Sequence, residues 1–135
     1  MKMDLHNNIA VVRAISPVAI GTTGTGKTSG VLDTAGYSGV EFVASYGTIT
    51  STTAVFTAIL TESTATGSGF TSVADSDLLG TEAAFVPAVG TRVSGSNKNC
   101  VKKLGYVGNK RYLKIQVYSA ATATTPIGVD MLLHS

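Results

Sequence analysis

Short stretches in which apolar and polar residues alternate recur along this chain, separated by clusters of Gly, Ser, Thr and Asn. In the clearest, Tyr112–Tyr118, the side chains of Leu113, Ile115 and Val117 point to one face of an extended chain. A period of two residues is typical of a strand that is half buried against a core. No stretch combines helix formers, a period of about 3.6 residues and capping residues over more than about two turns. The chain is therefore predicted to be all-β.

Further strands are expected where β-branched and aromatic residues are dense. They are Ile9–Ile15, which Pro17 is expected to end, a short run around Val31–Leu32, Gly39–Tyr46, Val55–Thr61, Cys100–Val107 and Ile127–Leu133. About seven or eight short strands with turns between them predict an antiparallel β-sandwich or jelly roll. A helical turn is expected only within Val73–Ala84, where Asp75 could cap it and Gly80 would end it.

The length and composition predict one domain that works in an assembly. A chain of 135 residues matches a single domain, which we divide into an N-terminal arm, residues 1–8, and a β-sandwich, residues 9–135. Only 13% of the residues are charged, well below the usual share of about 25%. A surface with so little charge is expected to be covered in part by other subunits.

The sequence also excludes several other classes of protein and of binding site. No apolar run approaches the ~20 residues of a membrane span, and the N-terminus lacks the apolar core of a signal peptide, so we expect synthesis inside the cell and no membrane association. Cys100 is the only cysteine, which excludes an intrachain disulfide and a cysteine-based zinc site. His6 and His134 lie near the two ends of the chain and are expected to be solvated.

One segment, Gly21–Thr28, matches the phosphate-binding pattern G-x-x-x-x-G-K-[ST] at all of its specified positions: Gly21, Gly26, Lys27 and Thr28. That pattern binds phosphate because it opens a helix whose N–H groups and dipole face the anion. Here two further glycines and no helical periodicity follow Lys27. A nucleotide-binding α/β domain also needs helices between its strands. We therefore interpret the match as chance and predict no cofactor.

No other set of residues predicts catalysis or metal binding. Asp75 and Asp77 could share one face of a loop, but no further carboxylate lies beside them to complete a Ca²⁺ site. A Ser-His-Asp set and paired catalytic carboxylates are also missing from the sequence pattern. The chain is therefore predicted not to be an enzyme.

Charge is distributed unevenly along the chain. Every charged residue between Thr28 and Gly90 is acidic, and every one between Thr91 and Lys114 is basic. Three interpretations remain open: pairing of basic with acidic strands inside the sheets, complementary contacts with neighbouring subunits, and nucleic-acid binding through basic residues interleaved with Tyr106 and Tyr112. A net charge of only +2 makes the nucleic-acid footprint a weak one.

Four segments together carry a resemblance to a known family: Ile9–Pro17, Val31–Tyr37, Asp77–Thr81 and Gly105–Tyr112. In this order they resemble the capsid decoration, or cement, proteins of tailed bacteriophages, and the resemblance spans most of the chain. It implies a β-sandwich or jelly roll, often a homotrimer, that sits on the capsid surface of the virion where major capsid protein subunits meet. It implies no catalytic residue.

On this basis we expect a structural virion protein that binds and stabilises the assembled shell. The arm is expected to reach a neighbouring subunit, while basic residues meet acidic capsid surface; the candidate contacts are Met1, Lys2, Leu5, Lys102, Lys103, Lys110 and Arg111. A head–tail connector or tail component is the first alternative. A nucleic-acid-binding β-domain is the second.

Overall fold

The computed structural model describes residues 1–20, 26–88, 98–119 and 125–135. Within these ranges the chain forms ten strands and three short 3₁₀ turns. The strands are β1 (Ile9–Ile20), β2 (Lys27–Thr28), β3 (Leu32–Asp33), β4 (Gly39–Tyr46), β5 (Phe56–Ser63), β6 (Thr71–Ser72), β7 (Leu78–Leu79), β8 (Val101–Tyr106), β9 (Tyr112–Ser119) and β10 (Thr125–His134). The 3₁₀ turns are η1 (His6–Asn8), η2 (Asp75–Asp77) and η3 (Ala83–Phe85).

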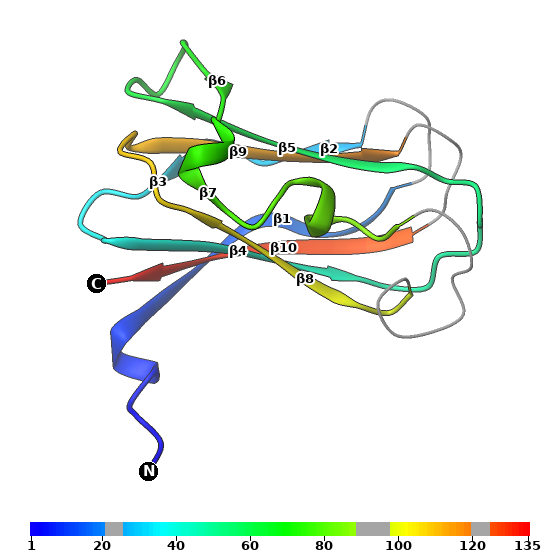
Figure 1. Cartoon of the computed structure of the whole chain (residues 1–135), viewed down its shortest axis with the longest axis horizontal. Helices are drawn as coiled ribbons and strands as arrows, with labels where there is room; N and C mark the ends of the chain where they lie inside the picture. The colour runs from blue at the N-terminus through cyan, green and yellow to red at the C-terminus, as the bar shows by residue number, and fades with distance from the viewer. Residues whose placement is uncertain (21–25, 89–97, 120–124) are drawn as a thin grey trace.

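The strands form two antiparallel sheets that pack face to face (Figure 1). Sheet A has the order β1-β10-β4-β8-β7, and sheet B has the order β2-β9-β5-β6, with β3 also pairing with β9. The predicted all-β sandwich is thereby confirmed, and it forms a single domain. In the described ranges, no helix is long and apolar enough to cross a membrane.

The core consists of the inward residues of the long strands. Strands β9 and β10 bury every second residue, as their sequence alternation predicts. Phe42, Leu60, Leu104, Ile115 and Met131 all have a relative exposure of 0%. These side chains come from both sheets, so a single shared core holds the two layers together.

Strand β1 continues past Pro17 to Ile20, whereas the sequence predicts that Pro17 ends it. The pairing with β10 shifts its register between Arg13 and Ile15 and again between Ile15 and Val18. These irregularities accommodate a residue that lacks a backbone N–H, and β1 is the edge of sheet A, where proline is tolerated.

Residues 73–86 close the side of the sandwich between β5 and β8 (Figure 1). The Val73 N–H donates to the Leu60 carbonyl of β5, and β7 pairs with β8. The Glu82 carboxylate accepts the Leu60 N–H at 2.8 Å, and the Tyr46 hydroxyl donates to the Phe85 carbonyl at 2.7 Å. This one segment therefore links sheet A to sheet B. One helical turn was expected in this segment. The structure has two separate 3₁₀ turns there, η2 and η3.

Candidate interaction surface

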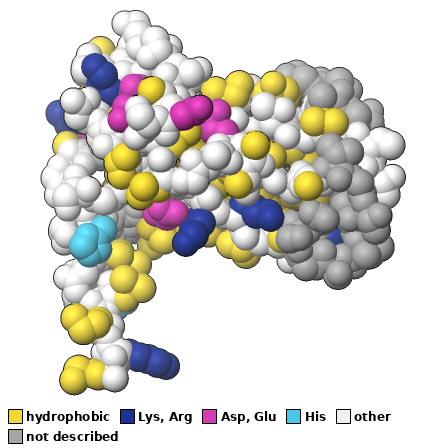
Figure 2. Space-filling view, viewed as in Figure 1, with side chains coloured by type: hydrophobic (Ala, Val, Ile, Leu, Met, Phe, Trp, Pro, Cys, Tyr) yellow, Lys and Arg dark blue, Asp and Glu magenta, His cyan; other side chains and the backbone are white. Residues whose placement is uncertain are grey.

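The N-terminal arm, Met1–Asn8, stands clear of the sandwich on the side of sheet A (Figure 1). Met1, Met3 and Leu5 are all exposed, the last two by 87% and 62%. Figure 2 shows hydrophobic side chains exposed along this projecting segment. Since exposed apolar residues grouped on a projection mark interaction sites more often than scattered ones do, the arm is suited to contact another subunit.

A small hydrogen-bonded turn sets the direction of the arm. The Asp4 carboxylate accepts the Asn7 backbone N–H at 3.2 Å and the Asn7 side-chain amide at 2.7 Å. These hydrogen bonds lower the pKa of Asp4. The Asn8 N–H donates to the Leu5 carbonyl at 3.1 Å, which completes the turn just before β1 begins. The turn therefore joins the exposed residues to the edge strand of sheet A.

The outer face of sheet A is the side toward which the arm projects, and it is partly apolar. Five residues on neighbouring strands lie opposite one another and form one row across the sheet. In order from β1 to β7 they are Val11, Leu132, Glu41, Gly105 and Leu79. In the next row, Arg13 pairs with Asp130 and Val43 with Lys103. The face thus combines apolar residues with charges of both signs, as protein interfaces do.

The outer face of sheet B is more polar. Its strands β5 and β9 place one apolar residue, Ile59, and the more polar Thr57, Thr61, Lys114, Gln116 and Tyr118 on the half-exposed side. The Lys114 ammonium lies 4.5 Å from the centre of the Phe70 ring. Because most of its residues are hydrophilic, this face is suited to solvent contact.

A groove of about 290 Å³ lies at the arm end of the outer face of sheet A, and we name it the Glu41 groove. Its lining includes Ile9, Glu41, Leu79, Val107, Leu132 and His134. Leu79 and Val107 are exposed by 58% and 54%. Among the described residues, the Glu41 carboxylate has no hydrogen bond and no ion pair. Burial raises its pKa, and the charge of Lys103 opposes that shift.

The close approach of Glu41 to Gly105 shapes this groove. A side chain at residue 105 would place its Cβ 2.7 Å from Glu41 Oε2 and 2.7 Å from the Cβ of Leu79. Only glycine leaves room there for both neighbours. The carboxylate therefore lies flat over the sheet beside an apolar side chain.

The four basic residues predicted to contact a shell do not form one patch. Lys103 pairs with Val43 and Lys102 with Ala44, so the alternation of β8 directs the two lysine side chains to opposite faces of sheet A. Lys110 and Arg111 lie in the turn between β8 and β9. Only Lys103 therefore belongs to the outer face described above.

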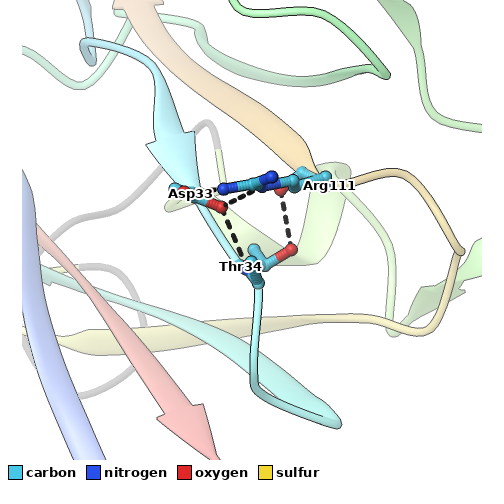
Figure 3. A network of polar contacts seen from close by, with 4 residues as sticks. Asp33, Thr34 and Arg111 are labelled. Carbon is cyan, nitrogen blue, oxygen red and sulfur yellow. Dashed lines mark hydrogen bonds and ion pairs between the residues drawn. The ribbon is translucent and has the colours of Figure 1, made fainter.

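Arg111 is already paired within the chain (Figure 3). Its guanidinium donates to both carboxylate oxygens of Asp33, at 2.8 Å each, and lies 5.0 Å from the centre of the Tyr112 ring. The Arg111 carbonyl accepts hydrogen bonds from the Thr34 N–H and hydroxyl. Pairing of the acidic half with the basic half inside the fold, one of the three interpretations of the charge pattern, therefore occurs at this position.

The same loops enclose a polar cleft of about 380 Å³. At its wall the Tyr106 hydroxyl donates to Glu62 Oε2 at 2.6 Å and accepts the Lys110 N–H at 3.0 Å. Burial, and then the hydrogen bond to Glu62, raise the pKa of Tyr106 to about 12. These groups satisfy one another and so hold the loop after β8 in place.

The residues of the phosphate pattern lie in a strand rather than at a helix. Lys27 and Thr28 form β2, opposite Val117 and Gln116 of β9. A side chain at Gly26 would place its Cβ 2.1 Å from the Val117 carbonyl oxygen. Gly26 therefore serves the close packing of two strands. Gly21 lies outside the described residues.

The other residues singled out from the sequence lie in several elements of the fold. Cys100 is buried, and burial raises the pKa of its thiol. His6 and His134 are exposed. Asp75 and Asp77 belong to η2. In the described part of the chain, no group of three or more His, Cys, Asp or Glu side chains could hold a metal ion.

Sequence reasoning did not identify the Glu41 groove. Its residues come from β1, β4, β7, β10 and the turn after β8, so only the pairing of the strands brings them together. The one available signal was an acidic residue, Glu41, within a mostly apolar strand. The chain matches no known protein-family model and no curated protein.

Proposed function

We propose that this chain is a structural virion protein of the capsid decoration type, which binds the assembled major capsid shell and stabilises it. The observation that carries the proposal is that the exposed apolar arm leaves the sandwich on the side of the partly apolar outer face of sheet A (Figure 1). The arm and this face together give a two-part docking surface for protein subunits.

The chemistry of this surface supports a protein partner. Arg13, Lys103, Glu41 and Asp130 provide charges of both signs, and Val11, Val43 and Leu132 provide apolar area. Such a mixture sets how another protein is aligned on this surface. It does not attract the phosphates of a nucleic acid uniformly. A ligand that binds only the assembled shell stabilises it by mass action.

Assembly into a homotrimer at the sites where shell subunits meet is part of this proposal. Three linked copies, each with a weak contact, hold a shell far more tightly than one copy does. Low overall charge, at 13% of residues, is consistent with a chain whose surface is covered in its working state.

The copy number of the chain in purified particles tests the proposed function. Quantitative mass spectrometry against the major capsid protein should find a fixed ratio, such as one copy per shell subunit or one trimer per few subunits. A handful of copies per particle would instead indicate a head–tail connector or tail component. Absence from particles would exclude both virion roles and favour the nucleic-acid-binding domain.

Deletion of residues 1–8 tests the docking surface itself. The deletion removes no core residue, so the sandwich should keep its circular dichroism spectrum and its unfolding temperature. Occupancy on the particles should fall. Unchanged occupancy would exclude a role for the arm in attachment.

A further inference from the structure

We propose that copies of this chain associate by arm exchange, in which Met1–Leu5 of one copy occupies the Glu41 groove of a second copy. This assigns the partner of the arm, and it does not depend on the proposed function. The arm and the groove lie at the same end of the molecule, since Ile9, the first residue of β1, lines the groove.

The arm and the groove have complementary chemistry. In an extended chain before the turn, Met1 and Met3 point to one side, and Lys2 points to the other. The groove offers exposed Leu79 and Val107 for the apolar side chains. It also offers one carboxylate, Glu41, and its described lining holds no lysine or arginine. The ammonium of Lys2 would therefore form an ion pair with the carboxylate of Glu41.

The unpaired state of Glu41 strengthens this match. Its carboxylate lies beside Leu79, over Gly105. The charge of Lys103 acts on it, but among the described residues it has no hydrogen bond and no ion pair. A partly buried carboxylate without a hydrogen-bonded partner is costly, and a cation brought by another copy reduces that cost.

The turn at the base of the arm favours contact of the arm with another copy over folding of the arm back onto its own sandwich. Asp4 binds both nitrogens of Asn7, and the Asn8 N–H donates to the Leu5 carbonyl. With this turn in place, the arm projects away from its own sandwich (Figure 1). The three residues before the turn, Met1–Met3, reach at most about 11 Å when extended, enough to lie along a groove of a neighbouring copy.

Sedimentation velocity of the full chain over a concentration series tests the proposal. The native chain should associate reversibly. Leu79→Asp places a charge in the groove and should lower the association constant about tenfold or more. Val101→Asp is the matched control, because Val101 is an exposed apolar residue of the same face outside the groove, 66% exposed. It should associate as the native chain does.

A charge exchange tests the residue pairing directly. Lys2→Glu and Glu41→Lys should each weaken association, by about threefold to tenfold, and the double variant should recover most of the loss. A mixture of arm-deleted chain and Leu79→Asp chain should form a heterodimer, since one supplies the groove and the other the arm. Circular dichroism confirms that each variant is folded.

Three results would overturn arm exchange: a native chain that stays monomeric at all concentrations, equal loss in Leu79→Asp and Val101→Asp, or no recovery in the double variant. The proposed function is tested separately by particle binding. A chain that associates but does not bind shells removes the proposed function alone. A chain that binds shells but fails these tests removes arm exchange alone.

Discussion

The guanidinium of Arg111 and the carboxylate of Asp33 form a bidentate ion pair between the turn that precedes β9 and strand β3, with Nε and Nη2 each 2.8 Å from one oxygen. The Asp33 carboxylate also accepts the Ala35 N–H at 3.0 Å. The side chains of Arg111 and Asp33 are 54% and 49% exposed, so the pair contributes more to loop geometry than to stability.

This pair predicts a specific acid response. The hydrogen bonds from Arg111 and then from Ala35 lower the pKa of Asp33 to about 2. A carboxyl whose pKa is lowered in the folded state adds stability above its unfolded pKa of about 3.9, and this stability is lost as the pH falls toward about 2. Arg111→Gln should therefore raise the pKa of Asp33 toward its ordinary value, as measured by NMR titration of the carboxyl carbon.

Arg111→Lys distinguishes geometry from charge in the same titration. A lysine keeps the charge but cannot donate to both oxygens as the planar guanidinium does, so the pKa of Asp33 should lie between those of the native chain and Arg111→Gln. A native Asp33 that titrates at its ordinary pKa would show that the pair does not persist in solution.

Removing the Tyr46 hydroxyl should destabilise the sandwich. Tyr46 is buried, which raises the pKa of its hydroxyl, and that hydroxyl donates to the Phe85 carbonyl. Tyr46→Phe leaves a buried carbonyl without this donor and should lower the free energy of unfolding by about 1–3 kcal/mol in urea denaturation. Tyr118→Phe is the control, because its hydroxyl makes no hydrogen bond within the described residues. Equal effects of the two changes would contradict this account.

Glu82 is expected to stabilise the fold through a carboxylate oxygen that accepts a hydrogen bond, rather than through its charge. Its carboxylate accepts the Leu60 N–H of β5, a position that a neighbouring strand would otherwise fill. Glu82→Ala should lower the free energy of unfolding by about 1–3 kcal/mol, whereas Glu82→Gln keeps an acceptor and should cost less. Hydrogen exchange of the Leu60 amide should accelerate in the alanine variant alone. Similar exchange in both variants would exclude the contact.

Gly26 and Gly30 should respond differently to the same change. Gly26 has a φ of +53°, and a Cβ there would lie 2.1 Å from the Val117 carbonyl oxygen, whereas a Cβ at Gly30 meets nothing within 4 Å. Gly26→Ala should therefore destabilise the chain by at least about 1–2 kcal/mol, while Gly30→Ala should be nearly neutral. Thermal unfolding of both variants measures the difference. An unchanged Gly26→Ala variant would mean that β2 does not pack against β9 as described.

The sequence predicted the strands whose two faces differ in polarity. In β9 and β10 the buried side is apolar and the other side is mixed, so a period of two residues identifies them and their inward faces. Gly39–Tyr46 was predicted with the bounds that β4 has. The sandwich follows from these alternations, because each strand has one face to bury.

Features that depend on a partner strand could not be predicted in this way. The continuation of β1 past Pro17 requires the irregular pairing with β10, and no local pattern encodes it. The Glu41 groove likewise needs the adjacency of Glu41, Gly105 and Leu79, which are far apart in the sequence. The run of basic residues could be read from the sequence, but their separation in the fold could not. The alternation of β8 directs Lys102 and Lys103 to opposite faces, and Arg111 forms an ion pair with Asp33.

The pairing of β1 with β10 has a consequence for how the chain folds. Among the described strands, β1 pairs only with β10 in sheet A, so that sheet cannot be completed until β10 has formed. Non-local pairings of this kind slow folding to a range of about milliseconds to seconds, because a long loop must close before any contact is gained. Until then β1 presents an unpaired, partly apolar edge that can associate with other unfinished chains. Expression at low temperature, or with chaperones in excess, should therefore raise the yield of folded protein.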